Sequence, residues 1–496
     1  MIDGEKHVRV TQSAHDHGRN TEKCKEGHRN MRTIRKDGFF MAFTISVSCM
    51  IGGIHMKKLT RILCFLIISG LLAGCGTRHS ADGADSAQMP VGSEQSGSSY
   101  ASESFRNMLL QHPDIRKLTE KSIAQAATIN PDRETNPVQS LDELYEFLDY
   151  PVTCMPWNIM PEERYDSFAT KCDQSILYVY WLLDQPLQEL ESQDLFYPSV
   201  EYLEPVYQWL TEYNTTWRDF LDTEESWKPE YLDMLMQDAS WNLDKGWYES
   251  PDNWHSFNDF FSRKLSGDAA RPIAAPLDDS VVISPADSLP QGLWSIDEEG
   301  MFYADPILRE DAVMIKDSTY ISVEQLLGAD GAEYASLFHN GYLTHTYLNY
   351  DDYHRYHSPV SGTVEAVYTI PYANAVGGVV YWDDESELYV LESNSLSWQS
   401  IETRGCVLIH SNYGMVAVIP VGMGQVSSIN FLDSIKPGAK ITKGDELGYF
   451  LFGGSDCVML FEGSAGFRLT APEGGTGSYS AGYAHVYCRE EYGRFQ

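Results

Sequence analysis

The chain has 496 residues and a mass of 56.0 kDa, more than a single hydrophobic core usually serves, so we expect two or more domains. Apolar residues make up 43% of the chain and aromatic residues 12%, which excludes collagen, full disorder and a small disulfide scaffold. Lys and Arg number 36 against 71 Asp and Glu, a net charge of −35. Such a charge repels phosphate backbones, so we expect no binding to nucleic acid.

Residues 56–74 have the three parts of a secretory signal peptide: basic residues, an apolar run from Ile62 to Ala73, and small residues before Cys75. The apolar run is too short to span a bilayer. The ending Leu72-Ala73-Gly74-Cys75 resembles a bacterial lipobox, in which the cysteine becomes the amino terminus and carries acyl chains. We therefore expect a lipoprotein of the bacterial cell envelope, extracytoplasmic and lipid-anchored at Cys75. The alternative is an ordinary thiol at the end of a buried helix.

Residues 1–55 fit nothing that should precede a signal peptide, and we interpret them as a mis-assigned upstream extension. A true first membrane segment is the alternative. Loss of residues 1–74 would remove 12 basic and 6 acidic residues and change the net charge from −35 to −41. Residues 75–104 are rich in Ser, Gly, Ala and Asp, which predicts a flexible tether. The cysteines beyond Cys75 are odd in number and form no CxxC motif, so neither a disulfide framework nor a zinc site is predicted.

The segment that follows has helical periodicity. Ser140-Leu-Asp-Glu143 has the pattern of a capping box that starts a helix, and Pro151 would end it. Apolar residues recur at three- and four-residue steps from Val206 to Leu221. Eight of the eleven Trp residues lie between positions 157 and 254. We therefore predict a helical domain over residues 105–250 with an aromatic core of its own.

Beyond Arg271-Pro272, short β-branched runs separated by Gly, Pro, Asn and Asp predict strands. Residues 357–364 and 435–448 combine a glycine turn with alternating apolar residues, as in the hairpins of barrel-sandwich folds. The expected fold class is therefore α+β. An N-terminal helical domain would precede a mainly β domain with barrel-sandwich-like hairpins over residues 251–496.

Gly453-Gly454-Ser455, between two apolar runs, is the sharpest candidate for chemistry. By itself this pattern is equally typical of a strand, a turn and a strand. Glycine also allows strained backbone angles and leaves the peptide carbonyl open, so the Ser455 hydroxyl could attack the carbonyl of Gly454. Elimination from the resulting ester, followed by hydrolysis, would leave a pyruvoyl group. That group would form a Schiff base with an amine and accept the electrons left when CO2 departs.

Four sequence motifs, which follow one another along the chain, support the interpretation that Ser455 becomes a pyruvoyl group. They are Phe257-Asn-Asp-Phe-Phe-Ser-Arg263 with Arg271-Pro272, Ser284-Pro-Ala-Asp287, Asp352-Tyr-His354-Arg-Tyr-His357, and Lys443 through Ser455. Their order and spacing resemble phosphatidylserine decarboxylases over about residues 250–460. Residues 105–250 are similar to the helical domain attached to soluble relatives, some of which act on free aromatic amino acids.

The resemblance implies roles for individual residues. Ser455 would become the pyruvoyl group after self-cleavage of the Gly454–Ser455 bond, leaving a 42-residue C-terminal fragment. His357, with a pKa near neutral, would be the general base of this processing and would be oriented by Asp287, while His354 would assist decarboxylation. From the residues alone, His354 and His357 could instead bind a metal from one face of a turn. No third ligand is evident nearby in the sequence, so no metal site is predicted.

Two positions depart from the family pattern. Asp456 stands where Thr or Ser usually follows the modified serine, and its carboxylate adjoins a site that must form an oxyanion, so we expect slower cleavage. Ser288 stands where Gly commonly follows the catalytic Asp, which would alter the turn but leave the carboxylate in place. Neither departure removes a catalytic group, so we expect an active enzyme; an inactive homologue is the alternative.

Three functions remain open from the sequence. The first is conversion of phosphatidylserine to phosphatidylethanolamine and CO2, with the lipid anchor holding the site near the bilayer. The acidic charge and the lack of an amphipathic membrane segment oppose it. The second is decarboxylation of a free amino acid, for example an aromatic one. The third is a non-catalytic binding lipoprotein, whose chain would stay uncut. The expected partners are a phospholipid or small amino acid and the membrane, and the oligomeric state is left open.

Overall fold

The computed structural model describes residues 100–160, 164–165, 167–193, 195–304, 322–371, 377–392, 398–424, 428–475 and 480–496. The upstream extension, the signal peptide and Cys75 lie outside the described residues, so these assignments stay predictions. The described residues belong to one compact unit. The domain boundary near residue 250 also stays a prediction.

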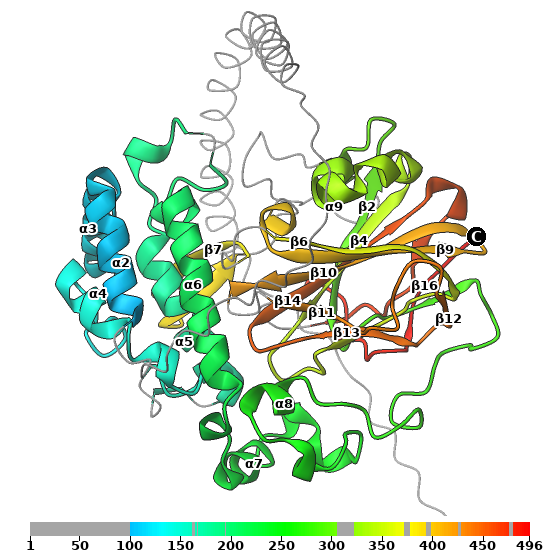
Figure 1. Cartoon of the computed structure of the whole chain (residues 1–496), viewed down its shortest axis with the longest axis horizontal. Helices are drawn as coiled ribbons and strands as arrows, with labels where there is room; N and C mark the ends of the chain where they lie inside the picture. The colour runs from blue at the N-terminus through cyan, green and yellow to red at the C-terminus, as the bar shows by residue number, and fades with distance from the viewer. Residues whose placement is uncertain are drawn as a thin grey trace, which may run out of the picture. The chain divides into compact units, whose positions relative to one another are not determined.

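Most α-helices of the described residues precede the strands, and α2 to α6 lie together beside the sheet (Figure 1). The helices are α2 (Tyr100–Gln111), α3 (Pro113–Ile129), α4 (Leu141–Phe147), α5 (Phe168–Leu183), α6 (Glu204–Leu221), α7 (Pro229–Leu235), α8 (Phe257–Phe261) and α9 (Val323–Gly331).

The predicted start of helix α4 is confirmed. The Ser140 side chain accepts a hydrogen bond from the backbone N–H of Glu143, and the helix ends at Phe147, ahead of Pro151. Helix α2, in contrast, begins at Tyr100 and so includes residues 100–104, which were predicted to be part of the tether. Composition alone missed this helix because its stabilising contact is distant in sequence: both the backbone N–H and the hydroxyl of Ser102 donate to Asp149.

Helix α6 confirms the periodicity predicted from Val206 to Leu221. Trp209, Tyr213 and Trp217 recur on its buried face, and each is at most 3% exposed. A helix with one apolar face needs a partner to cover that face. The partners of α6 include Phe105 of α2, whose ring lies 4.3 Å from that of Trp209, and Phe452 of the sheet region, 5.7 Å from the ring of Trp217.

The strands follow the helices. They are β1 (Val281–Ile283), β2 (Leu289–Ile296), β3 (Phe302–Ala304), β4 (Tyr342–Leu348), β5 (Arg355–His357), β6 (Gly362–Ile370), β7 (Val379–Asp383), β8 (Leu388–Glu392), β9 (Arg404–Ser411), β10 (Gly414–Met423), β11 (Ile429–Phe431), β12 (Lys440–Ile441), β13 (Glu446–Phe450), β14 (Gly454–Phe461), β15 (Arg468–Leu469) and β16 (Glu491–Arg494).

Eight of these strands form one antiparallel sheet in the order β12-β6-β9-β10-β14-β4-β2-β3, with β14 between β10 and β4. The described strands also form two three-stranded sheets, β1-β16-β15 and β11-β13-β5, and the pair β7-β8. Helices and antiparallel sheets together confirm the α+β class. The two glycine-containing segments expected to form hairpins pair with each other, since β5 pairs with β13 and β6 with β12.

Strand β14 has a different core on each face. Val458 and Leu460 belong to a large apolar cluster that the sheet shares with the helices. Cys457 and Met459 belong to a second cluster, which includes residues of the smaller sheets. Successive side chains of a strand point to opposite faces, so adjacent residues at the start of β14 face different surroundings.

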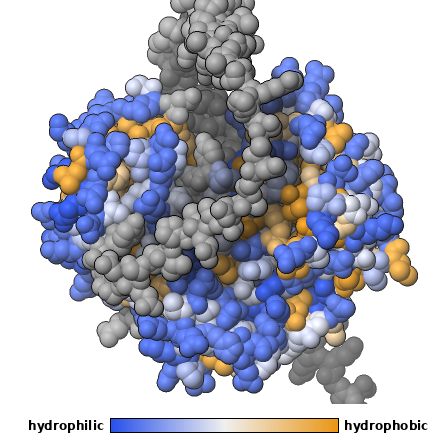
Figure 2. All heavy atoms as spheres, viewed as in Figure 1, coloured by the Kyte–Doolittle hydropathy of each residue, from blue (hydrophilic) through white to orange (hydrophobic). Residues whose placement is uncertain are grey.

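Within the described ranges, none of the helices combines the length and the apolar character that crossing a bilayer requires. The face seen in Figure 2 is mainly hydrophilic, with apolar residues in smaller groups, as the excess of acidic residues leads one to expect. Large exposed apolar side chains are spread along the chain, from Leu110 to Tyr381, and Leu277 is 98% exposed. Scattered exposed apolar residues of this kind are ordinary on a folded protein.

Candidate active site

Backbone hydrogen bonds bring three of the four sequence motifs together around the end of β13. The N–H of Phe452 donates to the side-chain oxygen of Asn258 in helix α8, at 3.0 Å. The N–H of Phe450 donates to the carbonyl of His354, at 2.9 Å. The Phe257 motif and the His354 motif therefore both contact the segment that leads into Gly453-Gly454-Ser455.

Ser455 lies near the start of the central strand β14, opposite Leu348 of β4 and Gly422 of β10. Its side chain is fully buried, and its Oγ has no hydrogen-bond partner among the described residues. A buried hydroxyl without a partner costs free energy, so such a group is a candidate for chemistry. Just ahead, Gly453 has φ of 144°, a backbone conformation that favours glycine over any other residue.

His354 presents a free lone pair to the protein interior. Its Nδ1 lies 3.0 Å from the carbonyl of Asp352, and a carbonyl only accepts, so Nδ1 carries the proton. The other nitrogen, Nε2, is buried and has no partner among the described residues. The imidazole stacks on the ring of Phe261, with 3.9 Å between ring centroids.

His357, by contrast, has a partner at both ring nitrogens. Nδ1 donates to the carbonyl of Gly444 at 2.9 Å, which fixes the tautomer, and Nε2 accepts from the hydroxyl of Tyr353 at 3.0 Å. Its backbone N–H donates to the carbonyl of Pro285, in the Ser284–Asp287 motif. This contact joins the Ser284–Asp287 motif to the other three motifs.

Both histidines are fully buried, and burial favours the neutral imidazole. Burial, together with the charge of Arg263, therefore lowers the pKa of His354 to about 3. Burial likewise lowers the pKa of His357 to about 3, against the hydrogen bond to Gly444 that works in the other direction. The prediction of a near-neutral pKa for His357 is thus wrong, because the sequence did not reveal how deeply this ring is buried.

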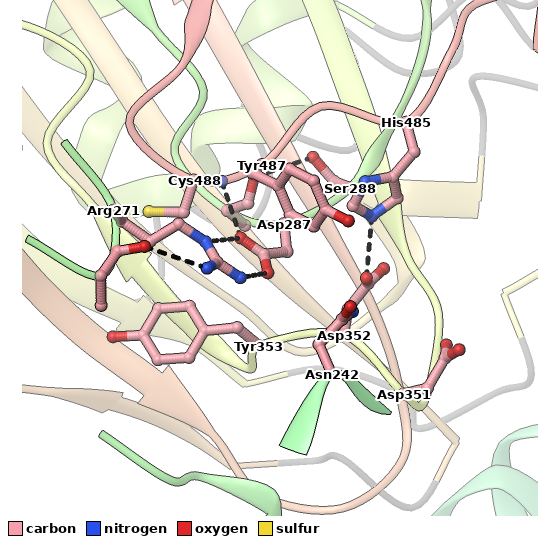
Figure 3. A network of polar contacts seen from close by, with 12 residues as sticks. Asn242, Arg271, Asp287, Ser288, Asp351, Asp352, Tyr353, His485, Tyr487 and Cys488 are labelled. Carbon is pink, nitrogen blue, oxygen red and sulfur yellow. Dashed lines mark hydrogen bonds and ion pairs between the residues drawn. The ribbon is translucent and has the colours of Figure 1, made fainter. Parts of the chain in front are cut away.

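Asp287 is paired with an arginine. Arg271 Nη2 lies 2.7 Å from one carboxylate oxygen, while the other oxygen accepts from the backbone N–H of Cys488 at 2.7 Å (Figure 3). Both side chains of this ion pair are at most 4% exposed. The expectation that Asp287 orients His357 is therefore wrong in this structure, since other groups occupy both ring nitrogens of His357. A buried carboxylate needs a close cation, and Arg271 meets that need.

A second acid–base pair lies beside Asp287. His485 Nε2, from the C-terminal segment, lies 2.8 Å from Asp352 Oδ1 (Figure 3). Burial raises the pKa of Asp352 to about 6. Burial alone would lower the pKa of His485, but the charge of Asp352 and the hydrogen bond outweigh it and raise that pKa to about 9. Sequence reasoning missed His485 because it belongs to none of the four motifs.

Arg263 is a further residue to which the sequence assigned no role. It is fully buried, and its Nη2 donates to the carbonyls of Asp351 and Asp352, at 2.9 and 3.0 Å. The guanidinium lies 4.4 Å from the ring centroid of Tyr248, a cation–π contact. Its Nε and Nη1 have no hydrogen-bond partner among the described residues. Arg263 thus holds the turn that precedes His354, and its position within the Phe257 motif was the available signal.

The two departures from the family pattern have separate outcomes. Asp456 follows Ser455 on the strand, so its side chain points to the opposite face, where the carboxylate contacts His345. The carboxylate therefore does not face the Ser455 hydroxyl, and its effect on cleavage stays a prediction. The Oγ of Ser288 accepts from the hydroxyl of Thr346 at 2.6 Å and its backbone pairs with Val486, while its effect on the turn stays a prediction.

Across the described ranges, no three His, Cys, Asp or Glu side chains come together in a group that could hold a metal ion. The cysteines at positions 154, 172, 406, 457 and 488 are all free. The groups of this site that can take part in chemistry include a serine hydroxyl, two neutral imidazoles and the buried ion pairs around them.

Comparisons with known proteins agree with the motifs. A family model described as phosphatidylserine decarboxylase matches residues 257–482. The chain is 33% identical over 240 residues to phosphatidylserine decarboxylase proenzyme 2 of Oryza sativa, a match that covers 48% of this chain and 34% of that protein. It is 28% identical over 221 residues to the proenzyme of Fusobacterium nucleatum and 32% identical over 229 residues to that of Clostridium beijerinckii, covering 44% and 45% of this chain.

The matched part spans 64% of the Fusobacterium protein and 66% of the Clostridium protein, so this chain covers between about one third and two thirds of these relatives' lengths. All four motifs lie within residues 257–482, and hydrogen bonds join them to one another and to the segment that leads into Ser455. On this combination of sequence match and converging motifs, residues 257–482 of the chain are similar to the phosphatidylserine decarboxylase family.

Proposed function

We propose that this protein is a pyruvoyl-dependent decarboxylase that cuts its own backbone between Gly454 and Ser455 and converts phosphatidylserine to phosphatidylethanolamine and CO2. The observation that carries the proposal is the Ser455 hydroxyl, buried on a central strand, without a partner among the described residues, directly after two glycines. The similarity of residues 257–482 to phosphatidylserine decarboxylase proenzymes supports the same proposal.

Self-cleavage would begin at the hydroxyl of Ser455. Ser455 Oγ attacks the carbonyl carbon of Gly454, and the peptide nitrogen leaves, so that an ester replaces the amide. Removal of the Ser455 α-proton then expels the Gly454 carboxylate. Water converts the remaining enamine to a ketone and ammonia, which leaves a pyruvoyl group at the start of a 42-residue fragment. Gly453 supports the attack, because a residue without a Cβ can adopt this positive φ and leaves space beside the peptide bond that reacts.

The surroundings of Ser455 fit a pyruvoyl group, which supplies an electron sink for the bond that breaks when CO2 leaves. Phe452, three residues ahead, is 1% exposed and packs against Phe257, Phe261 and Trp217, so these rings exclude water from the segment that leads into Ser455. His354 can accept and return a proton at Nε2, the nitrogen whose lone pair has no partner among the described residues. These are the properties that a decarboxylase site needs.

We also propose that the protein is an extracytoplasmic lipoprotein anchored through Cys75. The lipobox-like ending before Cys75 supports this, and acyl chains at that position would bring the decarboxylase to a membrane that contains its substrate. Incubation of growing cells with a labelled fatty acid, followed by mass spectrometry of the N-terminal peptide, tests the anchor. An unacylated Cys75 would remove this part of the proposal and leave the catalytic part in place.

The catalytic proposal is tested with purified native protein and the Ser455→Ala variant. We expect the native chain to separate into two fragments under denaturing conditions, with a pyruvoyl group on the 42-residue fragment by mass spectrometry, and to release CO2 from phosphatidylserine vesicles. The Ser455→Ala chain should stay whole and inactive, and the Ser464→Ala chain, changed at an exposed serine, should behave like the native one. A native chain that stays whole overturns the proposal and favours a non-catalytic binding protein.

A second candidate function is decarboxylation of a free amino acid by the same chemistry. The observation that favours it is the cover that α6 places over the serine end of β14 and β10. Asn214 donates to the carbonyl of Gly424, just beyond β10, and Trp217 packs on Phe452. A covered site suits a small substrate. Release of CO2 from tryptophan, tyrosine or serine, with none from vesicles, would establish this candidate and overturn phosphatidylserine as the substrate.

A further inference from the structure

Asp456 is the first residue after the proposed new end of the chain, and its side chain is fully buried. Its position on β14 makes it the neighbour of Tyr347 on β4, with His345 two residues farther along β4 on the same face. Diagonal neighbours of this kind are within reach of long or aromatic side chains. His345 accordingly places its Nδ1 2.7 Å from Asp456 Oδ2.

Two further groups complete the surroundings of the Asp456 carboxylate. The backbone N–H of Thr346 donates to Oδ1 at 3.2 Å, and Nε2 of Gln399 donates to Oδ2 at 3.4 Å. His345 itself is held by stacking against Trp294, with 5.2 Å between the ring centroids. Both carboxylate oxygens therefore have partners, as a fully buried carboxylate requires.

All three partners of Asp456 precede Ser455 in the chain. After cleavage between Gly454 and Ser455 they would belong to the long fragment, whereas Asp456 would belong to the short one. The hydrogen bonds would then join the two fragments one residue away from the pyruvoyl group. The cut removes the covalent restraint at this point, so the new chain end needs another one to stay in position.

From this geometry we infer that Asp456 is a positioning residue: with His345 and Gln399 it anchors the newly formed end of the short fragment and so holds the reactive carbonyl in the site. The inference rests on the proposed function and adds to it a role for a residue that takes no part in bond breaking. Because the Asp456 side chain points away from the Ser455 face, it acts through the backbone and not by contact with substrate.

The anchor itself can be tested without any pyruvoyl chemistry, in the Ser455→Ala chain, which is expected to stay uncut. Amide hydrogen exchange of the peptide covering residues 454–458 would be compared with and without Asp456→Ala. We expect exchange at least about 10-fold faster when the side-chain hydrogen bonds are absent. Asp456→Asn should restore most of the protection, because an amide can still accept from Thr346 and donate to an unprotonated His345 Nδ1.

The effect on positioning is tested in the processed protein. Turnover is measured per mole of pyruvoyl group, which is counted by mass spectrometry of the short fragment. We expect Asp456→Ala to lower kcat about 10- to 100-fold with KM nearly unchanged, and Asp456→Asn to stay within about threefold of native. The matched control is Val458→Ala, two residues along on the same face of β14, which destabilises the core but should leave kcat per pyruvoyl unchanged.

Three results would overturn the inference: unchanged exchange in Asp456→Ala, equal loss in the Ala and Asn variants, or an equal fall in kcat per pyruvoyl in Val458→Ala. Failure of the proposed function is visible separately. A native chain that forms no pyruvoyl group overturns that function and the positioning role with it, and hydrogen exchange then still decides whether Asp456 restrains the strand.

Discussion

Different kinds of side chain are buried in two regions of the described chain. These are the helical region, residues 100–261, and the sheet region, residues 281–496. The helical region holds Trp157, Trp181, Trp209, Trp217 and Trp241, all at most 3% exposed. The sheet region holds Asp287 of the buried ion pair with Arg271, the two neutral histidines, and the Ser455 hydroxyl, which has no partner among the described residues.

This difference shows how the two regions divide their tasks. Aromatic packing is non-directional and contributes mainly stability, whereas buried polar groups must have defined partners and therefore fix positions. The helical region reaches the site through ring contacts, such as Trp217 on Phe452 and Trp247 over the guanidinium of Arg271 at 3.7 Å. The side-chain amides of Asn214 and Asn258 also bond to the backbone of Gly424 and Phe452. We therefore expect changes in the sheet region to alter chemistry and matched changes in the helices to alter stability alone.

The largest effect is expected at the buried Arg271–Asp287 pair. Asp287→Asn leaves the Arg271 charge buried without a counter-ion and should lower the free energy of unfolding by about 3 to 5 kcal/mol. Denaturant unfolding measures this. The control is Glu387→Gln, which removes an exposed partner of Arg164 and should cost less than about 1 kcal/mol. Equal losses in the two variants would contradict the structural role given to Asp287.

A smaller effect is expected at His354, and it concerns the rate of decarboxylation. His354→Gln removes the lone pair at Nε2, so decarboxylation per pyruvoyl should fall at least about 100-fold, equivalent to about 2.7 kcal/mol of barrier. Steady-state kinetics on the processed protein measures it. His410→Gln, at an exposed histidine of strand β9, should retain native turnover. A His354→Gln enzyme with native turnover would remove His354 from the mechanism.

The Asp352–His485 pair should make stability depend on pH. Because the folded protein raises the pKa of His485 above its ordinary value of about 6.5, the protonated histidine stabilises the fold fully below pH 6.5, and this stabilisation is lost as the pH rises through about 9. Asp287 and Asp351 also face His485 and favour its charge, while Tyr487 contacts its ring. His485→Gln should therefore cost about 2 kcal/mol near pH 6.5 and progressively less toward pH 9.5.

Unfolding curves of the native protein and of His485→Gln across this pH range provide the measurement. A constant difference between pH 6.5 and 9.5 would show that the pair does not titrate in this window. Asp352→Asn is the partner control, because without the carboxylate the main cause of the raised His485 pKa is gone and the pH dependence should largely disappear.

The smallest effect is expected in the helical region. Ser140→Ala removes the N-cap of helix α4 and should lower the free energy of unfolding by about 1 kcal/mol. Turnover per pyruvoyl should not change, because α4 has no contact with the histidines or with Ser455 among the hydrogen bonds of the described residues. A parallel loss of turnover would contradict the division of tasks between the two regions.

Local patterns in the sequence were sufficient for the α+β class, the start of α4, the buried face of α6 and the order of the four motifs. These features depend on neighbours three or four residues away or on residue type, both of which can be read from the sequence. The resemblance of the four motifs to a known family placed Asp287, His354, His357 and Ser455 in one predicted site, and hydrogen bonds join the segments that carry them.

Only the tertiary structure decided which partner each polar group has. It paired Asp287 with Arg271, linked His357 to Tyr353 and Gly444, and joined His485 to Asp352 across 133 positions. It also set the low pKa of both site histidines, because that shift depends on burial. The residue type determines which hydrogen bonds a side chain can donate or accept. The pairing of distant strands determines which partners the side chain has and how much water remains around it.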